Sequence, residues 1–347
     1  LGYGQFVKRQ RFAAPTITDD GQINRPGLET VSVQNPDLKW EQTTDFNIGI
    51  DFGFNLDRFS GSLDFYRKET RDLLFKQAAA APAFDPFVFK NLENGKLINS
   101  GVELGLNYDF INNDKVTFSG GFNISYNNNE VKGLNGTTAD FGEVRGPGLS
   151  QAFAQRLGEG RSIFSYYMAT YSEDASGNPN FSADEKDFVD QDAVPDVTSG
   201  LTLNLKADRW DANLFFAGQF GFSVYNNTRN AFLNRPTFET SRNTDQVGLG
   251  LVSQEVSTLY LEKGDFVRLQ NATVGYTVPL SGDGTFKNLR FSLTGQNLLL
   301  FTGYSGLDPE IVANTGDGFG SGIPSQGIDY TTFPRPLTVT LGINAKF

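Results

Sequence analysis

The stretch Leu-Thr-Val-Thr-Leu-Gly-Ile-Asn-Ala-Lys-Phe, residues 337–347, decides the fold class. Every odd position is apolar, from Leu337 to Phe347, and every even position is Thr, Gly, Asn or Lys. A strict period of two is typical of a β-strand whose two faces meet different surroundings. The run is also about twice as long as the five or six residues of an ordinary strand. These features indicate a strand that crosses a thick apolar layer.

The same alternation recurs along the chain. With residues 337–347 it predicts eleven strands, the others lying at about 46–52, 59–65, 102–110, 116–126, 151–157, 163–171, 201–207, 210–222, 266–278 and 289–301. Strands of a soluble sandwich also alternate, but they are shorter than roughly 9–11 residues, the length that a tilted strand needs to cross an outer membrane. We therefore expect an all-β fold, a transmembrane antiparallel β-barrel whose outer side contacts the lipid bilayer.

The connections between these strands alternate in length, as in outer-membrane barrels, where short turns face the periplasm and long loops face outside. Short turns are expected near 54–58, 111–114, 158–161, 207–209 and 279–287, and long loops near 71–96, 130–149, 172–196, 224–262 and 302–333. Residues 1–40 would then form an extracellular loop leading into the first strand. Phe347 would end on the periplasmic side.

Aromatic side chains gather near the expected periplasmic ends of the strands. The set on the apolar face comprises Phe52, Phe59, Phe110, Phe118, Trp210, Tyr276, Phe291 and Phe347. Aromatic rings collect at the depth of the lipid headgroups. This girdle, drawn from distant parts of the chain, favours the membrane barrel over a soluble sandwich.

Composition excludes several kinds of chemistry. The chain has no His and no Cys, which removes Ser-His-Asp and Cys-His nucleophilic sites, His or Cys metal sites and disulfides. The formal net charge of −11 offers no basic surface for a nucleic acid. Glycosidic acid–base chemistry would need two opposed carboxylates, and no spacing suggests a pair. We expect no enzyme activity, no nucleic-acid partner and no cofactor.

The expected loop at 172–196 is rich in carboxylates. It holds Glu173, Asp174, Asp184, Glu185, Asp187, Asp190, Asp192 and Asp196 against the single Lys186. Ca²⁺ binds six to eight oxygens, so Asp184, Asp187, Asp190 and Asp192 are its candidate ligands. The Asp-x-Asp-x-Asp-Gly order of an EF-type loop is absent. We favour a solvated loop that binds no metal tightly.

Aromatic residues also occur in the expected outer loops, at Tyr225, Phe232, Phe238, Tyr304, Phe319 and Tyr330. Such rings stack on sugars or pack against a protein that covers the barrel. The alternative is that the long loops fold back and pack their own aromatics. Tyr225, Phe232, Tyr304 and Tyr330 are the candidates for contact with a substrate or a covering protein.

Several motifs are strong in combination. They are Asn35-Pro36-Asp37-Leu38-Lys39-Trp40-Glu41, Gly101-Val102-Glu103-Leu104, Phe266-Val267-Arg268-Leu269-Gln270-Asn271, Gly275-Tyr276-Thr277-Val278-Pro279, Gly295-Gln296-Asn297-Leu298, Tyr304-Ser305-Gly306, Asp308-Pro309-Glu310, Gly327-Ile328-Asp329-Tyr330 and Phe333-Pro334-Arg335-Pro336. Their order and spacing over nearly the whole chain resemble the C-terminal half of SusC/RagA-type TonB-dependent transporters of Bacteroidota. Arg335, between two prolines, marks the beginning of the last strand and is interpreted as structural.

The resemblance implies a bacterial outer-membrane importer of a large nutrient, an oligosaccharide or a peptide. It implies a plugged barrel of about 22 strands, energised through TonB and capped by a SusD-like surface lipoprotein. Residues 1–347 would form the C-terminal part of that barrel, because nothing in them resembles a plug domain or a TonB box. An odd number of strands cannot close a bacterial barrel, so the missing strands are expected to precede Leu1. The alternative is a SusC-like barrel that serves as a structural or interaction subunit of a larger outer-membrane complex.

Overall fold

The computed structural model describes residues 35–78, 87–146, 149, 151–175, 179–180, 185–232, 255–280, 287–310 and 325–347. It also gives the backbone of four short strands, β1 (Arg11–Ala13), β2 (Thr16–Asp19), β3 (Ile23–Pro26) and β4 (Glu29–Ser32). Strand β1 pairs with β4, and β2 pairs with β3. Among the described residues, none of the helices combines the length and the apolar character needed to cross a membrane.

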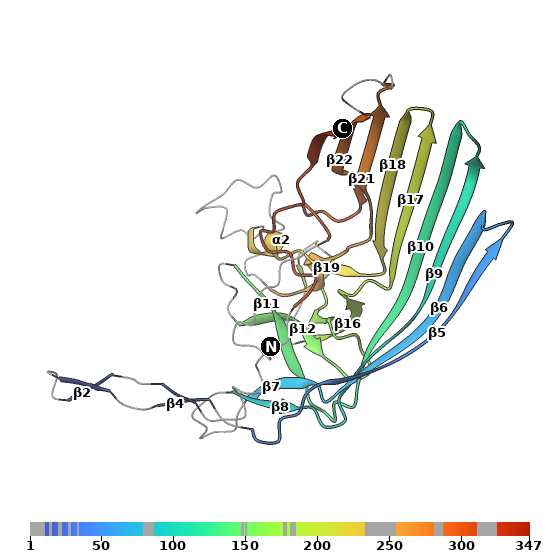
Figure 1. Ribbon diagram of the computed structural model, residues 1–347. Helices are drawn as coiled ribbons and strands as arrows, with labels where there is room; N and C mark the ends of the chain where they lie inside the picture. The colour runs from blue at the N-terminus through green and yellow to red at the C-terminus, as the bar shows by residue number, and fades with distance from the viewer. Residues whose placement is uncertain are drawn as a thin grey trace.

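A curved antiparallel sheet forms the wall of the molecule (Figure 1). Within the described part of the chain it has nine strands: β5 (Gln42–Phe54), β6 (Phe59–Arg71), β9 (Lys96–Asn112), β10 (Val116–Lys132), β17 (Val197–Ala207), β18 (Trp210–Phe220), β21 (Phe266–Thr277), β22 (Asn288–Thr302) and β23 (Thr338–Lys346). Each strand pairs with the preceding and following wall strands, and the order ends at β5 and at β23. The predicted antiparallel barrel fold is confirmed, as an open section of barrel wall.

The cross-strand register separates the two faces of the wall. Ile50, Leu63, Leu104 and Ile124 lie side by side across β5, β6, β9 and β10. The same register places Leu104, Phe122, Leu214, Leu293 and Leu341, each from the apolar positions of its strand, on this outer face. Leucine side chains on this face are unusually exposed: Leu293 is 54% exposed and Leu341 is 71% exposed. Such a continuous exposed apolar surface fits contact with hydrocarbon.

The opposite, inner face carries polar side chains that pair across the strands. The hydroxyls of Thr273 and Thr294 lie 2.9 Å apart, and Asn213 donates to Asn204 at 2.7 Å. Arg290 spans β21 to reach Asp211, with Nε 2.9 Å from the carboxylate. The inner face is therefore suited to water or to another polar protein surface.

A β-bulge at Gln270 changes which residues of β21 face outward. Both ladders skip this residue, because Leu269 pairs with Phe216 and Leu299, while Asn271 pairs with Phe215 and Gln296. One extra residue inverts the alternation. Ala272 and Leu269 consequently both face outward, and Arg268 faces inward.

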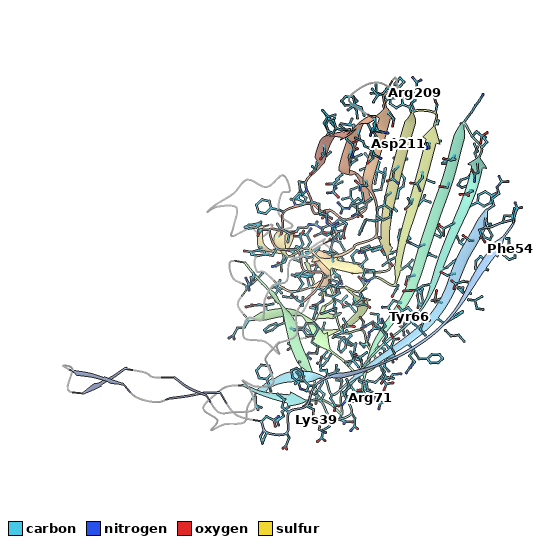
Figure 2. All side chains as sticks on the ribbon, in the orientation of Figure 1. Lys39, Phe54, Tyr66, Arg71, Arg209 and Asp211 are labelled. Atoms are coloured by element: carbon cyan, nitrogen blue, oxygen red, sulfur yellow. The ribbon has the colours of Figure 1, made fainter. Side chains whose placement is uncertain are left out.

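The ends of the wall hairpins carry the expected aromatic girdle. Phe52 and Phe59 have ring centroids 5.9 Å apart, and Phe110 and Phe118 are 4.8 Å apart. Figure 2 shows Phe54 and Arg209 at this end of the strands, with Arg71 at the other. The rings thus gather along one end of the sheet. Which compartment this end faces stays a prediction.

Two of the eleven predicted strands are not wall strands. The segments at 151–157 and 163–171 fall in β12 (Ala152–Leu157) and β13 (Ser165–Ala169), which join β11 (Ala139–Val144) and β16 (Lys186–Asp192) in a separate inner sheet. These strands have only five or six residues and are mostly buried on both faces, so they need no lipid-facing side. The expected count of eleven is therefore corrected to nine. Because an even number of strands leaves the predicted wall, each of the nine remaining strands keeps its predicted direction across the membrane.

The inner sheet packs with short elements inside the curve of the wall (Figure 1). These are β19 (Ser223–Tyr225), α2 (Asn227–Phe232), the 3-10 turn η1 (Thr258–Tyr260) and β20 (Leu261–Lys263). The chain also forms the hairpin of β7 (Leu74–Ala78) and β8 (Phe87–Asn91) and the short pair of β14 (Ser172–Glu173) and β15 (Pro179–Asn180). The main core contains Tyr166, Met168, Tyr225, Val256 and Ile328. Segments predicted as separate outer loops thus share one apolar core.

Candidate functional site

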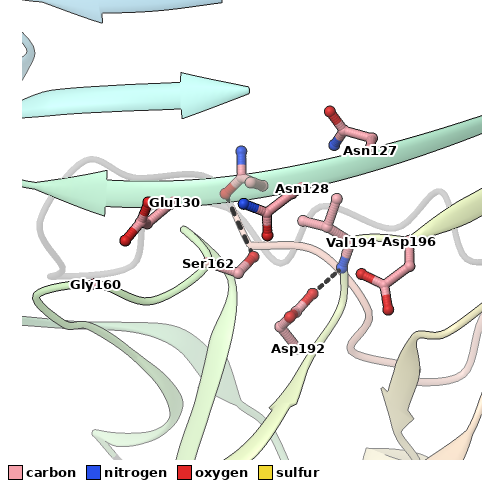
Figure 3. A pocket seen from close by; sticks show the side chains of 9 residues that line it. Asn127, Asn128, Glu130, Gly160, Ser162, Asp192, Val194 and Asp196 are labelled. Atoms are coloured by element: carbon pink, nitrogen blue, oxygen red, sulfur yellow. Dashed lines mark hydrogen bonds between the residues drawn. The ribbon is translucent and has the colours of Figure 1, made fainter. Parts of the chain in front are cut away.

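A polar cavity opens where the wall meets the inner sheet (Figure 3). We call it the rim cavity; it has a volume of about 290 Å³ and is lined by Asn127, Asn128, Asn129, Glu130, Gly160, Ser162, Asp192, Val194 and Asp196. The first four residues lie near the end of β10, the next two follow β12, and the last three are the final residue of β16 and two residues of its connection to β17. Three segments that are distant in sequence therefore build one site.

Hydrogen bonds from the wall fix the asparagines of the rim cavity. The hydroxyl of Tyr66 donates to Oδ1 of Asn127 at 2.8 Å, across the intervening strand β9. Gly101 lies beneath this contact, and a Cβ there would meet the Tyr66 hydroxyl and the backbone of β10. Asn129 donates to Asn99 at 2.7 Å and accepts the backbone N–H of Ile163 at 2.8 Å. Asn129 thus joins the wall to the inner sheet.

Two carboxylates lie opposite the asparagines. Asp192 accepts the backbone N–H of Val194 at 2.8 Å, and the backbone carbonyl of Asp196 accepts the N–H of Asn127 at 2.8 Å. Burial raises the pKa of the Asp192 carboxyl to about 6, although the N–H of Val194 opposes the rise, and the charge of Asp196 adds to it. Burial, followed by the charge of Asp265, also raises the pKa of Asp196. The site therefore holds acidic groups in a partly desolvated setting.

The basic side chains nearby are paired with other carboxylates, one of which, Glu130, itself lines the cavity. Lys132 Nζ lies 2.9 Å from the carboxylate of Glu130, and Arg161 lies 2.5 Å from Asp190, outside the cavity. Among the lining residues that the structure describes there is no Lys or Arg. Asp192 and Asp196 consequently have no cationic partner among the described residues that line the cavity.

The acidic residues proposed as Ca²⁺ ligands are spread apart. Asp187 accepts the N–H of Phe188, Asp190 pairs with Arg161 at the surface, and Asp192 lines the rim cavity. Asp184 lies outside the described residues. In the part of the chain that the structure describes, no three acidic side chains are arranged to hold a metal ion. Of the three that the structure describes, only Asp192 belongs to the candidate site.

The loop aromatics take several positions. Tyr225 is fully buried, and Asn230 donates to its hydroxyl at 2.8 Å. Tyr304 is 5% exposed and donates to Asp329 at 2.7 Å. Phe232 and Tyr330 are half-buried, whereas Phe238 and Phe319 lie outside the described residues. None of these four candidates lines the rim cavity, and their contact with a substrate or a covering protein stays a prediction.

A buried ion-pair network joins the wall to the segment before the last strand. Arg268, turned inward by the bulge, donates to Asp308 at 2.6 Å, and their side chains are only 4% and 8% exposed. Arg335 donates to Glu310 at 2.6 Å, which in turn lies 3.6 Å from Arg268. Three motifs of the resemblance meet here. Arg335 therefore has the expected structural role, and its partners were missed by sequence reasoning.

Another motif fastens the β7–β8 hairpin to the wall. Asn35 donates to the carbonyl of Phe89 at 2.8 Å, and Lys39 and Asn91 exchange two hydrogen bonds at 2.7 and 3.0 Å. Glu41 accepts the N–H of Leu74 at 2.8 Å. This motif organises structure outside the rim cavity.

The rim cavity residues of β10 escaped sequence reasoning. The run Asn127-Asn128-Asn129-Glu130 directly follows the alternating part of the strand, and such a polar run reads as the beginning of a loop. The structure shows that β10 continues to Lys132, six residues beyond the end of its apolar alternation. A polar run that directly follows such an alternation is therefore a useful signal of a strand that extends past the membrane. Strand residues beyond the apolar band project into the rim and its loops.

Comparison with known proteins gives consistent matches. Residues 2–298 match the family model described as TonB dependent receptor-like, beta-barrel. TonB-dependent receptor P3 of Formosa agariphila is 30% identical over 95% of the chain and 36% of its own length. TonB-dependent receptor SusC of Bacteroides thetaiotaomicron is 28% identical over 90% of the chain and 32% of its own length.

A solved structure shares the fold. The RagAB peptide transporter matches with a TM-score of 0.79 and 24% identity, over 98% of this chain and 39% of the matched chain. The chain spans about a third of the length of the curated relatives that it matches. These likenesses cover both the wall and the segments inside it.

Proposed function

The chain belongs to the family of TonB-dependent receptor-like β-barrels, and from this premise we propose that the protein imports a large nutrient, an oligosaccharide or a peptide, across the outer membrane. The family is one of outer-membrane transporters of the SusC/RagA type, which are not enzymes. The expectation that the chain is not an enzyme is thereby confirmed. The nutrient, the energy source and the partners belong to the proposal.

The observation that carries the proposal is the two-faced wall. Its outer face is a continuous exposed apolar surface, and its inner face is polar and holds the packed inner sheet with the rim cavity. A wall of this kind separates hydrocarbon from a polar interior in which a solute can move. Because the outer membrane has no gradient of its own, uphill import would draw its energy from the inner membrane through TonB.

The proposal includes a SusD-like surface lipoprotein that covers the outer mouth. This part of the proposal is supported by the sequence similarity to SusC and by the structural likeness to the RagAB peptide transporter. Affinity purification of the full-length protein from gently solubilised outer membranes tests this partner. A lipoprotein is expected in near-equal amount, and recovery of the barrel alone would contradict the partnership.

Import is tested in the natural host with a deletion strain and the same strain carrying the full-length gene. Defined mixtures of oligosaccharides and peptides are supplied, and their depletion from the medium is followed by mass spectrometry. The complemented strain is expected to deplete one class that the deletion strain leaves, and a protonophore should abolish the difference. Equal depletion by both strains would contradict the importer.

The same strains distinguish a structural subunit, the alternative for SusC-like barrels. For that role, deletion would leave depletion unchanged and would instead remove a large assembly from native gels of the outer membrane. The importer predicts the opposite pattern.

A further inference from the structure

The rim cavity has the size of a site for the end of a ligand. Its volume of about 290 Å³ lies at the lower limit of the roughly 300–1,000 Å³ that is usual for small-molecule sites. The inner side of β10 and the turn after β12 enclose it from opposite sides (Figure 3). One terminal group of a larger molecule fits such a space better than a whole oligomer.

The charged residues of the lining indicate that the bound terminal group carries a positive charge. Asp192 and Asp196 face the cavity, and the neighbouring cations Lys132 and Arg161 are paired with Glu130 and Asp190. Keeping two carboxylates close together and partly desolvated is unfavourable unless a cation compensates them. An anionic ligand would add repulsion, and a neutral one would leave both charges uncompensated.

The remaining groups favour an organic cation over a metal ion. Among the described residues no three acids have a metal-binding arrangement. The cavity instead supplies side-chain amides at Asn127 and Asn128 and a hydroxyl at Ser162. An ammonium group donates three hydrogen bonds to oxygen acceptors, while amide N–H groups bind the carbonyl or hydroxyl oxygens beside it.

We propose that the rim cavity binds a primary ammonium group of the imported molecule. The group is the free amino terminus of a peptide or the amine of an amino sugar. Asp192 and Asp196 accept its hydrogen bonds, and Asn127 and Asn128 bind the adjacent oxygens. The inference rests on the proposed import function and gives it a selectivity, since ligands with a free amine bind and their N-acetyl forms do not.

Calorimetry on the full-length protein in detergent at pH 7 tests the inference with matched probes. One pair is trialanine amide and its N-acetyl derivative; the other is the disaccharide of glucosamine and that of N-acetylglucosamine. At least one free amine is expected to bind ten or more times more tightly than its acetylated partner. Comparing the two pairs identifies the peptide or the sugar as the source of the amine.

Variants assign the binding to the rim cavity. Asp192→Asn combined with Asp196→Asn is expected to weaken binding of the amine at least tenfold. Asp187→Asn is the matched control, because Asp187 also lies on β16 but outside the cavity and is not the ion-pair partner of Lys132 or Arg161, and it should leave binding unchanged. Heat-modified migration on gels verifies that each variant is folded.

Three results would overturn the inference: equal affinity for free and acetylated probes, no saturable binding of either amine, or full binding by the double variant. The probe comparison on the unaltered protein decides the question even if the double variant misfolds. Failure of the importer itself shows separately, as unchanged nutrient depletion in the deletion strain.

Discussion

At the scale of single residues, the sharpest feature is the pairing of Arg268 with Asp308. Both side chains are nearly completely buried, and the contact is 2.6 Å. Removing one member of a buried ion pair leaves the other charge uncompensated in a medium of low dielectric constant. Replacing either Arg268 or Asp308 alone is therefore expected to destabilise the folded protein.

We expect Arg268→Met to lower the free energy of unfolding by about 3–5 kcal/mol. Urea titration of the folded full-length protein measures the loss. Arg335→Met is the control, because its guanidinium is one-third exposed, and it should cost about 1 kcal/mol or less. Equal losses for the two variants would contradict the special position of Arg268.

Asp192 gives a prediction with a defined pH dependence. Its pKa is about 6 in the folded protein and about 4 in an unfolded chain. The folded state thus binds more protons between these values, so this carboxyl makes the protein less stable as the pH rises from about 4 to 6. Above pH 6 the whole penalty is present.

Asp192→Asn removes this penalty while its amide oxygen still accepts the N–H of Val194. In the absence of ligand, the inner sheet of the variant should resist opening by about 1–2 kcal/mol more than the unaltered protein above pH 6, and equally below pH 4. Hydrogen exchange of peptides from β13 and β16 measures the difference. A constant difference across this pH range would show that the effect is not electrostatic.

At the scale of elements, the wall strands could be predicted because their signal is local. In β23 each side chain contacts either the outer or the inner surroundings, so the alternation is written in residues 337–347 alone. Strands β12 and β13 also alternate over short stretches, but their neighbours are core residues brought from Tyr225 and Ile328. Local sequence patterns do not show contacts between distant segments. The rim cavity could not be predicted for the same reason, because its lining comes from three separate segments.

The assignment of faces predicts opposite responses from two adjacent residues of β23. Leu341→Arg, on the outer face, should destabilise the folded barrel by roughly 2–4 kcal/mol, because it places a charge near the middle of the hydrocarbon layer. Thr340→Arg, on the inner face, should cost much less. Urea titrations compare the two, and similar losses would refute the assignment of the faces.

At the scale of the whole molecule, the wall has two open edges. Strand β5 is 13 residues long and pairs only with β6, and β23 pairs only with β22 among the described strands. Unpaired backbone groups in hydrocarbon cost several kcal/mol each. Both edges therefore require partner strands.

We expect a polypeptide of residues 1–347 alone to form no closed barrel. Refolding into detergent should give aggregates without the heat-modified migration of a folded monomer, whereas the full-length protein should show it. A monomeric, heat-modifiable product from residues 1–347 would demonstrate that the edges can join each other.

The bulge at Gln270 has a consequence for how the gene can vary. Losing that one codon would restore the simple alternation of β21 and turn Arg268 from its carboxylate partner into hydrocarbon. Gain or loss of a single codon elsewhere in a wall strand would exchange the two faces in the same way. Among natural alleles, insertions and deletions within the wall strands should therefore come in pairs of codons or coincide with a bulge, while the connecting segments accept any number.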